Sequence, residues 1–296
     1  MVALIDNNIG EANKSFSEAY DRSGKLGSFD ESSRLLFKQR LAFTYIRMGE
    51  GAKAEQLFRE LTDAFTKTDG PDSPNVLRVR LNLAQAFMVE QKHKDAVEET
   101  TRLYPMYVAK LGEEHELSMQ LLTTRAESEG ALGMYDDAVR DDQKIYNMAV
   151  RKRGAESFFA VATLSDTALA QCRAGRFKDG VLNARKSYET SVKAFGPRAG
   201  LTGGTAHTFA NCLIQLGQLD EASTLLANID PAAVGQLAGS KDWFANLELS
   251  EAEIAYRKHD LDNARKHLAV ATPILTRSDA EPYQQQAVRK LVAALK

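Results

Sequence analysis

The sequence predicts an all-α solenoid built from antiparallel helical hairpins, and three observations lead to this fold class. Small residues recur every 42 positions along nearly all of the 296-residue chain. Each period contains two amphipathic stretches with helical spacing, and a turn separates them. Four independent series share one phase, which chance does not explain. The series are Ala42, Ala84, Ala126, Ala168, Ala210 and Ala252; Ala12, Ala54, Ala96, Ala138, Gly180, Ala222 and Ala264; Gly49, Gly133, Gly175 and Gly217; and Gly70, Gly112, Gly154 and Gly196.

The first two series predict close helix packing. Stretches such as 36–45 and 54–61 each form one apolar face, and an alanine lies on both. A small side chain lets the two helix axes approach, whereas a larger one would push them apart. The third series predicts a tight turn with positive φ after each first helix, with Gln91 and His259 occupying the same phase.

A second break follows each hairpin, where glycine or proline ends the second helix, at 68–75, 110–116, 152–157 and 194–200. Ser73, Glu114 and Ser157 are placed to help start the next helix. In the fifth period the second helix is short and ends at Asp230–Pro231. The glycine-rich stretch 196–207 lacks the lysine of a phosphate loop and no strand precedes it, so we interpret it as a flexible connection between hairpins.

These residues resemble the tetratricopeptide repeat, and the long loops LGEEHE and DGPDSPN resemble its kinesin-light-chain variant. The resemblance implies a right-handed superhelix of about six repeats forming a single solenoid over 1–296. The expected repeats are 29–70, 71–112, 113–154, 155–196, 197–238 and 239–280, after a half-repeat at 1–28 and before a capping helix at 281–296. The half-repeat also suggests a chain cut from a longer protein, or one that begins with an unpaired cap. Repeat three departs from the pattern, because Arg125, Glu129 and Asp142 replace the usual leucine, tyrosine and phenylalanine.

Composition disfavours several functional classes. The chain has 38 basic and 40 acidic residues and a formal net charge of -2, so direct nucleic-acid binding is not expected. No apolar run has the length of a membrane span, and no leader-like start is present. Cys172 and Cys212 lie in no metal-binding spacing and cannot staple a chain of this size. They are compatible with a reducing cytoplasm, which we expect here, or with the periplasm if the chain is joined to a membrane-anchored regulator.

In the superhelix that the resemblance implies, one face of every first helix lines a concave wall. Its mixture of arginine, amide and apolar groups suits an extended peptide, although several members could instead be solvated. The expected wall residues are Gln39, Phe43, Arg47, Arg78, Asn82, Gln85, Thr123, Glu127, Leu169, Arg173, His207, Asn211, Gln215 and Arg257.

Other unusual residues have structural interpretations. Arg125 and Glu129 lie four apart on one helix and Asp142 should approach them, so we expect an internal ion-pair network. The five histidines show no metal-ligand spacing, and no metal or other cofactor is expected. Trp243 is expected to pack or cap rather than to stack on a ligand.

The leading functional hypothesis is a scaffold, not an enzyme, that binds a protein or peptide and is part of a larger regulatory protein. One alternative is the sensory or effector region of a bacterial winged-helix transcriptional regulator, which stretches such as SPNVLRVRLNLAQAF resemble. A small-molecule-binding or enzymatic helical domain is another, because a superhelical groove can close around a ligand. A homo-oligomer is compatible with all three.

Overall fold

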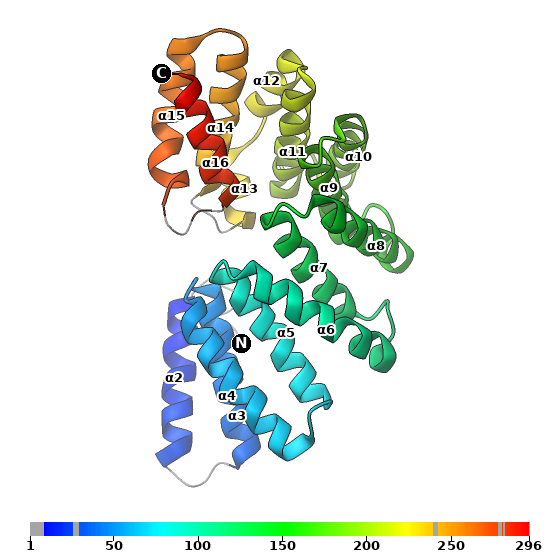
Figure 1. Cartoon of the computed structure of the whole chain (residues 1–296), viewed down its shortest axis with the longest axis vertical. Helices are drawn as coiled ribbons and strands as arrows, with labels where there is room; N and C mark the ends of the chain where they lie inside the picture. Colours follow the sequence, from blue (N-terminus) through cyan, green and yellow to red (C-terminus); the bar gives the residue numbers. More distant parts are fainter. Residues whose placement is uncertain (1–8, 26–29, 239–241, 278–279, 281, 296) are drawn as a thin grey trace. The chain divides into compact units, whose positions relative to one another are not determined.

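The computed structural model describes residues 9–25, 30–238, 242–277, 280 and 282–295. The chain divides into two compact units, unit 1 (Met1–Ser128) and unit 2 (Glu129–Lys296). Over the described residues there are fifteen helices and no strand, which confirms the all-α prediction. Figure 1 shows the helices within each unit running back and forth as successive hairpins.

Unit 1 is a series of long helices in which sequence neighbours pack together. Contacts join α2 to α3, α3 to α4, α4 to α5 and α5 to α6, and the two first helices α3 and α5 also touch. The helices are α2 (Ile9–Lys25), α3 (Glu31–Arg47), α4 (Gly51–Asp69), α5 (Pro74–Val89) and α6 (His93–Leu111); α7 (Glu116–Ala131) continues across the division between the units.

Unit 2 contains the remaining helices, and its first helices also contact one another, α9 with α11 and α11 with α14. The helices are α8 (Tyr135–Arg153), α9 (Phe158–Arg173), α10 (Phe177–Phe195), α11 (Gly200–Leu216), α12 (Leu219–Ala227), α13 (Pro231–Ala238), α14 (Asp242–Arg257), α15 (Leu261–Leu275) and α16 (Pro282–Ala294). The short α12 agrees with the break predicted at Asp230–Pro231.

The small-residue series occupy the packed faces of the helices. Every alanine of the first two series is buried, from Ala42 with no exposed area to Ala12 and Ala126 with 3%. At these points the helix axes come close enough that only a methyl group or a hydrogen atom fits between them. The 42-residue phase therefore marks the packing register, as the sequence predicts.

The turns inside the hairpins have the predicted backbone conformation. Gly49, Gly133, Gly175 and Gly217 all have positive φ, between 76° and 87°. Gln91 and His259 adopt the same region, with φ of 57° and 64°, although each has a Cβ that makes it less favourable. The turn geometry is thus retained where its glycine is absent.

Helix starts follow the capping prediction at two of three sites. The hydroxyls of Ser73 and Ser157 accept the backbone N–H groups of Val76 and Ala160, each at 3.3 Å. Before α7, His115 and not Glu114 precedes the helix, and its Nδ1 accepts the N–H of Leu117 at 3.2 Å.

The interpretation of 196–207 as a flexible connection is wrong from residue 200 onward, because α11 begins at Gly200. Tertiary packing overrides the weak helix propensity of its glycines. A Cβ at Gly203 would lie 2.2 Å from Cγ2 of Val234 and 3.2 Å from Cγ2 of Ile229. The absence of a side chain there lets the segment at 229–234 pack directly on α11.

Among the described helices, none combines the length and the apolar character that crossing a membrane requires.

Candidate functional site

One large cavity in unit 2, which we call the groove pocket, is lined mainly by the first helices of consecutive hairpins. Its volume is about 710 Å³. Leu169, Asn211 and Glu253 line it from α9, α11 and α14 and are each 42 residues apart; Arg173, Gln215 and Arg257 form a second such row. The sequence period therefore places equivalent side chains on one wall.

The wall residues predicted in unit 2 come together in this pocket. Leu169, Arg173, His207, Asn211, Gln215 and Arg257 all line it. Sequence reasoning missed the contributions of Ser250 and Asn246 from α14 and of Tyr283 and Lys290 from α16. The 42-residue spacing gave a partial signal that α14 and α16 also contribute, because the lining residues His207, Leu249 and Leu291 are spaced by 42 as well.

The predicted wall residues of unit 1 have different surroundings. Gln39 and Arg78 line a separate cavity of about 350 Å³. Phe43, Asn82, Gln85 and Thr123 are half-buried, whereas Arg47 and Glu127 are exposed. Their role in partner binding stays a prediction.

A hydrogen-bonded polar cluster, formed by His207, Asn211 and Ser250, lies in the groove pocket. Asn211 Nδ2 is 3.3 Å and Ser250 Oγ 3.1 Å from His207 Nε2. The Ser250 hydroxyl donates to Asn211 Oδ1 at 2.8 Å, which leaves the amide nitrogen facing the imidazole. This scheme favours a neutral ring in which Nε2 accepts a hydrogen bond.

Burial lowers the pKa of His207 to about 4, and a hydrogen bond to the backbone of Asn246 opposes this shift only in part. Trp243 packs against the same ring, with the ring centroids 5.8 Å apart. Trp243 also contacts the apolar core of unit 2, as its packing interpretation predicts. His207 is thus an uncharged polar group at neutral pH.

The cationic groups of the groove pocket are held in defined positions. Arg173 stacks over the ring of Tyr283, with its Cζ 3.8 Å from the ring centroid. Arg257 donates to the carbonyl of Ile214 at 2.8 Å and pairs with Glu253 at 2.6 Å. With Lys290, the lining has three cationic side chains against one carboxylate, which favours an anionic or carbonyl-rich occupant.

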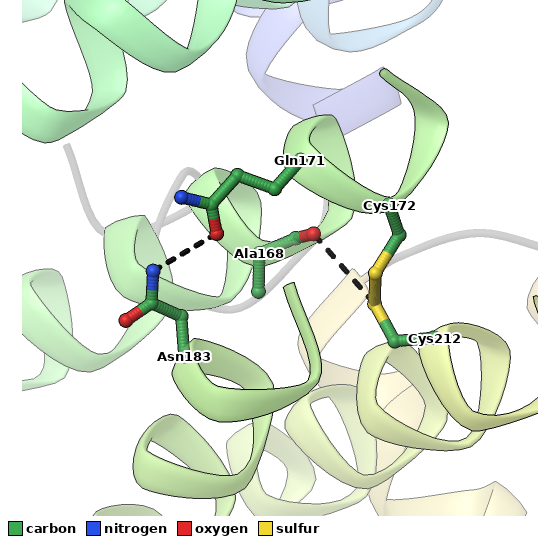
Figure 2. Close-up of a disulfide and its surroundings, with 5 residues drawn as sticks. All are labelled: Ala168, Gln171, Cys172, Asn183 and Cys212. Carbon is green, nitrogen blue, oxygen red and sulfur yellow. Dashed lines mark hydrogen bonds between the residues drawn. A yellow bond between two sulfur atoms is a disulfide. The ribbon is translucent and has the colours of Figure 1, made fainter. Parts of the chain in front are cut away.

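A disulfide joins α9 and α11 beside the groove pocket (Figure 2). Cys172, which lines the pocket, is bonded to Cys212, and their Cα atoms are 5.6 Å apart. Nearby, Asn183 on α10 donates to Gln171 at 2.9 Å. The sequence predicts that two cysteines cannot staple a chain of this size; the structure adds that they do link two neighbouring first helices.

Gly180 makes room for this disulfide. A Cβ at this position would lie 2.2 Å from Sγ of Cys172 and 3.0 Å from the carbonyl oxygen of Ala168. The other members of its series are alanines, so glycine occurs only in the hairpin that contains Cys172. The packing of the disulfide therefore depends on the absence of a side chain at residue 180.

The polar residues of repeat three are mostly buried. Glu129 and Asp142 are 6% and 8% exposed. Arg125 stacks over the ring of Tyr104 at 5.3 Å. An ion pair among the three stays a prediction.

Comparison with known proteins supports the repeat fold. Residues 33–107 match the tetratricopeptide repeat family model. No curated protein matches the chain. The structure resembles the TPR-like repeats of a Podosopora anserina kinesin light chain, with a TM-score of 0.62 and 21% identity over 72% of this chain and all of that one.

Two further structures cover the whole or nearly the whole chain. RapI in its apo form has a TM-score of 0.65 and 14% identity, covering 99% of this chain and 96% of that one. A Pyrococcus horikoshii STAND protein with a tetratricopeptide repeat sensor has a TM-score of 0.66 and 13% identity, covering 100% of this chain and 43% of that one. At these identities the likeness shows the fold, a TPR-type helical solenoid.

Proposed function

We propose that the groove pocket of unit 2 binds an extended peptide or a segment of a partner protein. The chain would then act as an interaction scaffold within a larger regulatory protein, and not as an enzyme. The observation that carries the proposal is the convergence of two 42-residue rows of side chains from α9, α11 and α14 on one pocket. A wall that repeats along its length suits a ligand that also repeats, as a polypeptide backbone does.

The chemistry of the pocket supports this choice of ligand. Amides such as Asn211 and Gln215 can bond the peptide backbone, and Leu169 and Leu249 offer apolar contact. Arg173 and Lys290 can hold a carboxylate. A protein of the same fold also has a bound partner: a Rap protein was solved complexed with competence and sporulation factor, with a TM-score of 0.63 and 13% identity to this chain.

A selection from a random peptide library, followed by affinity measurement on the selected peptides, tests the proposal. Arg173→Glu should weaken binding at least about tenfold, because it reverses a charge in the pocket and removes the stack on Tyr283. Lys178→Glu is the matched control, since this exposed lysine on α10 lies outside the pocket. Equal affinities for the two variants would contradict the assignment.

The second candidate function is a sensor of a small molecule within a bacterial transcriptional regulator. The tetratricopeptide repeat sensor of the STAND protein favours it by analogy of fold. Thermal stabilisation of the protein by metabolites, with no response to peptides, would replace the scaffold proposal by this one.

The compartment is part of the proposal. A structural disulfide persists in oxidising compartments, so Cys172–Cys212 supports the periplasmic alternative over the cytoplasm. Mass spectrometry of free thiols in protein trapped directly from cells distinguishes the two.

A further inference from the structure

Unit 1 contains two cavities in equivalent places of consecutive hairpins. The first notch lies between α3, α4 and α5 and includes Leu36, Phe65 and Thr68. The second notch lies between α5, α6 and the start of α7, has a volume of about 380 Å³, and includes Arg78, Tyr107 and Lys110. Arg78, Tyr107 and Lys110 are 42 positions after Leu36, Phe65 and Thr68, respectively. The fold therefore makes the same notch twice, and differences in its lining reflect the side chains alone.

The second notch has gained hydrogen-bond donors. Arg78, Lys110 and Tyr107 stand where the first notch has Leu36, Thr68 and Phe65, and the second notch also includes His115. Arg78 lines both notches, whereas Tyr107, Lys110 and His115 line the second alone. Since the first notch forms without these three groups, packing of the hairpins does not require them.

The hydroxyl of Tyr107 lacks a hydrogen-bond partner among the described residues. The side chain is fully buried, whereas Arg78 and Lys110 are exposed, so Tyr107 forms the inner wall of the notch. A buried hydroxyl with no partner costs free energy that a ligand could recover. Burial also raises the pKa of Tyr107, and the charges of Arg78 and Arg80 oppose this only in part. The hydroxyl therefore keeps its proton at neutral pH and can donate a hydrogen bond to an acceptor.

Three further donors surround the opening. The Arg78 guanidinium is held by Asn75 Oδ1 at 3.0 Å, which uses only one of its N–H groups. His115 uses Nδ1 to accept from Leu117, so a neutral ring has its proton on Nε2. Together with the Lys110 ammonium, these groups match an anion and no cation.

The rest of the lining is apolar. Leu77, Leu111 and Leu117 contribute to the walls, and Leu111 is 40% exposed despite its size. An inorganic anion would leave these surfaces in water, whereas an anion with an apolar group would cover them.

We propose that the second notch is a binding site for a small carboxylate with an aliphatic or aromatic body. The carboxylate is held by Tyr107, Arg78, Lys110 and His115, and the body lies against the leucine walls. This site is separate from the groove pocket and does not depend on its function.

Titration calorimetry of the full chain with phenylacetate and hexanoate tests the proposal, with hexan-1-ol and inorganic phosphate as comparisons. Saturable binding of a carboxylate, and at least about tenfold weaker binding of the alcohol and of phosphate, is expected because the site needs both the charge and the apolar body. No saturable carboxylate binding, or phosphate binding as tightly, overturns the proposal.

Variants that convert the second notch into the first provide the residue-level test. The double variant Arg78→Leu/Lys110→Thr should weaken carboxylate binding at least about tenfold. Because Arg78 also lines the first notch, Lys110→Thr alone and Tyr107→Phe, which change the second notch only, should each weaken binding as well. The control Arg102→Leu/Lys67→Thr makes the same change in charge at exposed residues outside the second notch and should bind as wild type.

Tyr107→Phe also separates binding from a structural role. The hydroxyl has no hydrogen-bond partner in the described part of the chain, so the free protein should be as stable as wild type or more so in a urea titration. Destabilisation of the free protein by this variant, or carboxylate binding that survives all the notch variants, rules the site out.

Discussion

The hairpins of unit 1 and the α9–α11 segment of unit 2 share a register but are stabilised by different chemistry. On the second helix of each hairpin, one buried position holds Leu61, Leu103 and Ile145 in turn and then Ser187. Four residues later, Phe65 and Tyr107 in unit 1 correspond to Ser191 on α10. The repeat therefore determines where side chains meet, but not whether the contact is apolar.

Each buried serine hydroxyl of α10 has a hydrogen-bond partner, which offsets the free-energy cost of burying it. Ser187 donates to the carbonyl of Val161 at 2.9 Å, and Ser191 lies 2.8 Å from the hydroxyl of Thr202. The Cys172–Cys212 disulfide adds a covalent link that the hairpins of unit 1 do not have. In this segment, hydrogen bonds and a cross-link take the place of part of the apolar contact area.

Removal of the cross-link should have the largest effect. The bonded cysteines are 40 residues apart. For a loop of this length, Cys172→Ala/Cys212→Ala should lower the free energy of unfolding by about 4 kcal/mol in the chain-entropy model. Urea titration followed by fluorescence of Trp243, the only tryptophan and a residue of unit 2, measures this.

A dithiol reductant should shift the wild-type transition by a similar amount and leave the double variant unchanged. If reductant and substitution have no effect on the wild-type midpoint, the disulfide does not stabilise this segment.

Positions 103 and 187 are equivalent in the repeat, so substitutions there compare a buried apolar side chain directly with a buried hydrogen bond. Leu103→Ala should cost about 3 kcal/mol, because it removes a fully buried side chain and leaves a cavity. Ser187→Ala should lower the free energy of unfolding by about 1 kcal/mol, the value of the one hydrogen bond that is lost. The cost is not larger because the carbonyl of Val161 remains part of helix α9. Urea titrations by circular dichroism give both values, and equal costs would show that the two positions do not differ as described.

Acid should destabilise unit 2 through His207. Its pKa is lowered in the fold to about 4 from 6.5, so the folded state takes up its proton later than the unfolded chain as the pH falls. The associated stability is complete above pH 6.5 and is lost as the pH falls toward 4, by at most about 1.4 kcal/mol per pH unit. His207→Gln should flatten this part of the stability profile, as followed by Trp243 fluorescence. An unchanged profile would mean that other groups cause the acid sensitivity.

Much of the fold could be predicted because the 42-residue phase is carried by residues whose size is constrained. Ala54, Ala96 and Gly49 lie where helices or turns allow little else. The segment after Gly200 was predicted incorrectly because its glycines indicate a loop locally. The contact of Gly203 with Val234 comes from a different hairpin element and is not visible in the local sequence.

Part of the groove pocket could also be predicted from the 42-residue phase. Arg173, Asn211 and Gln215 were found in the groove pocket because each lies on the inner face of a first helix. Tyr283 was not, because its helix α16 was interpreted as a solvating cap, and the stack with Arg173 depends on tertiary placement. The disulfide was missed although its spacing is two residues short of one period, which brings Cys172 and Cys212 onto facing sides of neighbouring first helices.

The clash that a methyl group at position 180 would make also restricts the order in which this hairpin acquired its features. A chain with alanine there has no space for the sulfur of Cys172 in its bonded position. Glycine alone weakens the helix by up to about 1 kcal/mol, a tolerable intermediate. Glycine first and the disulfide second is therefore the order of substitutions that avoids this clash.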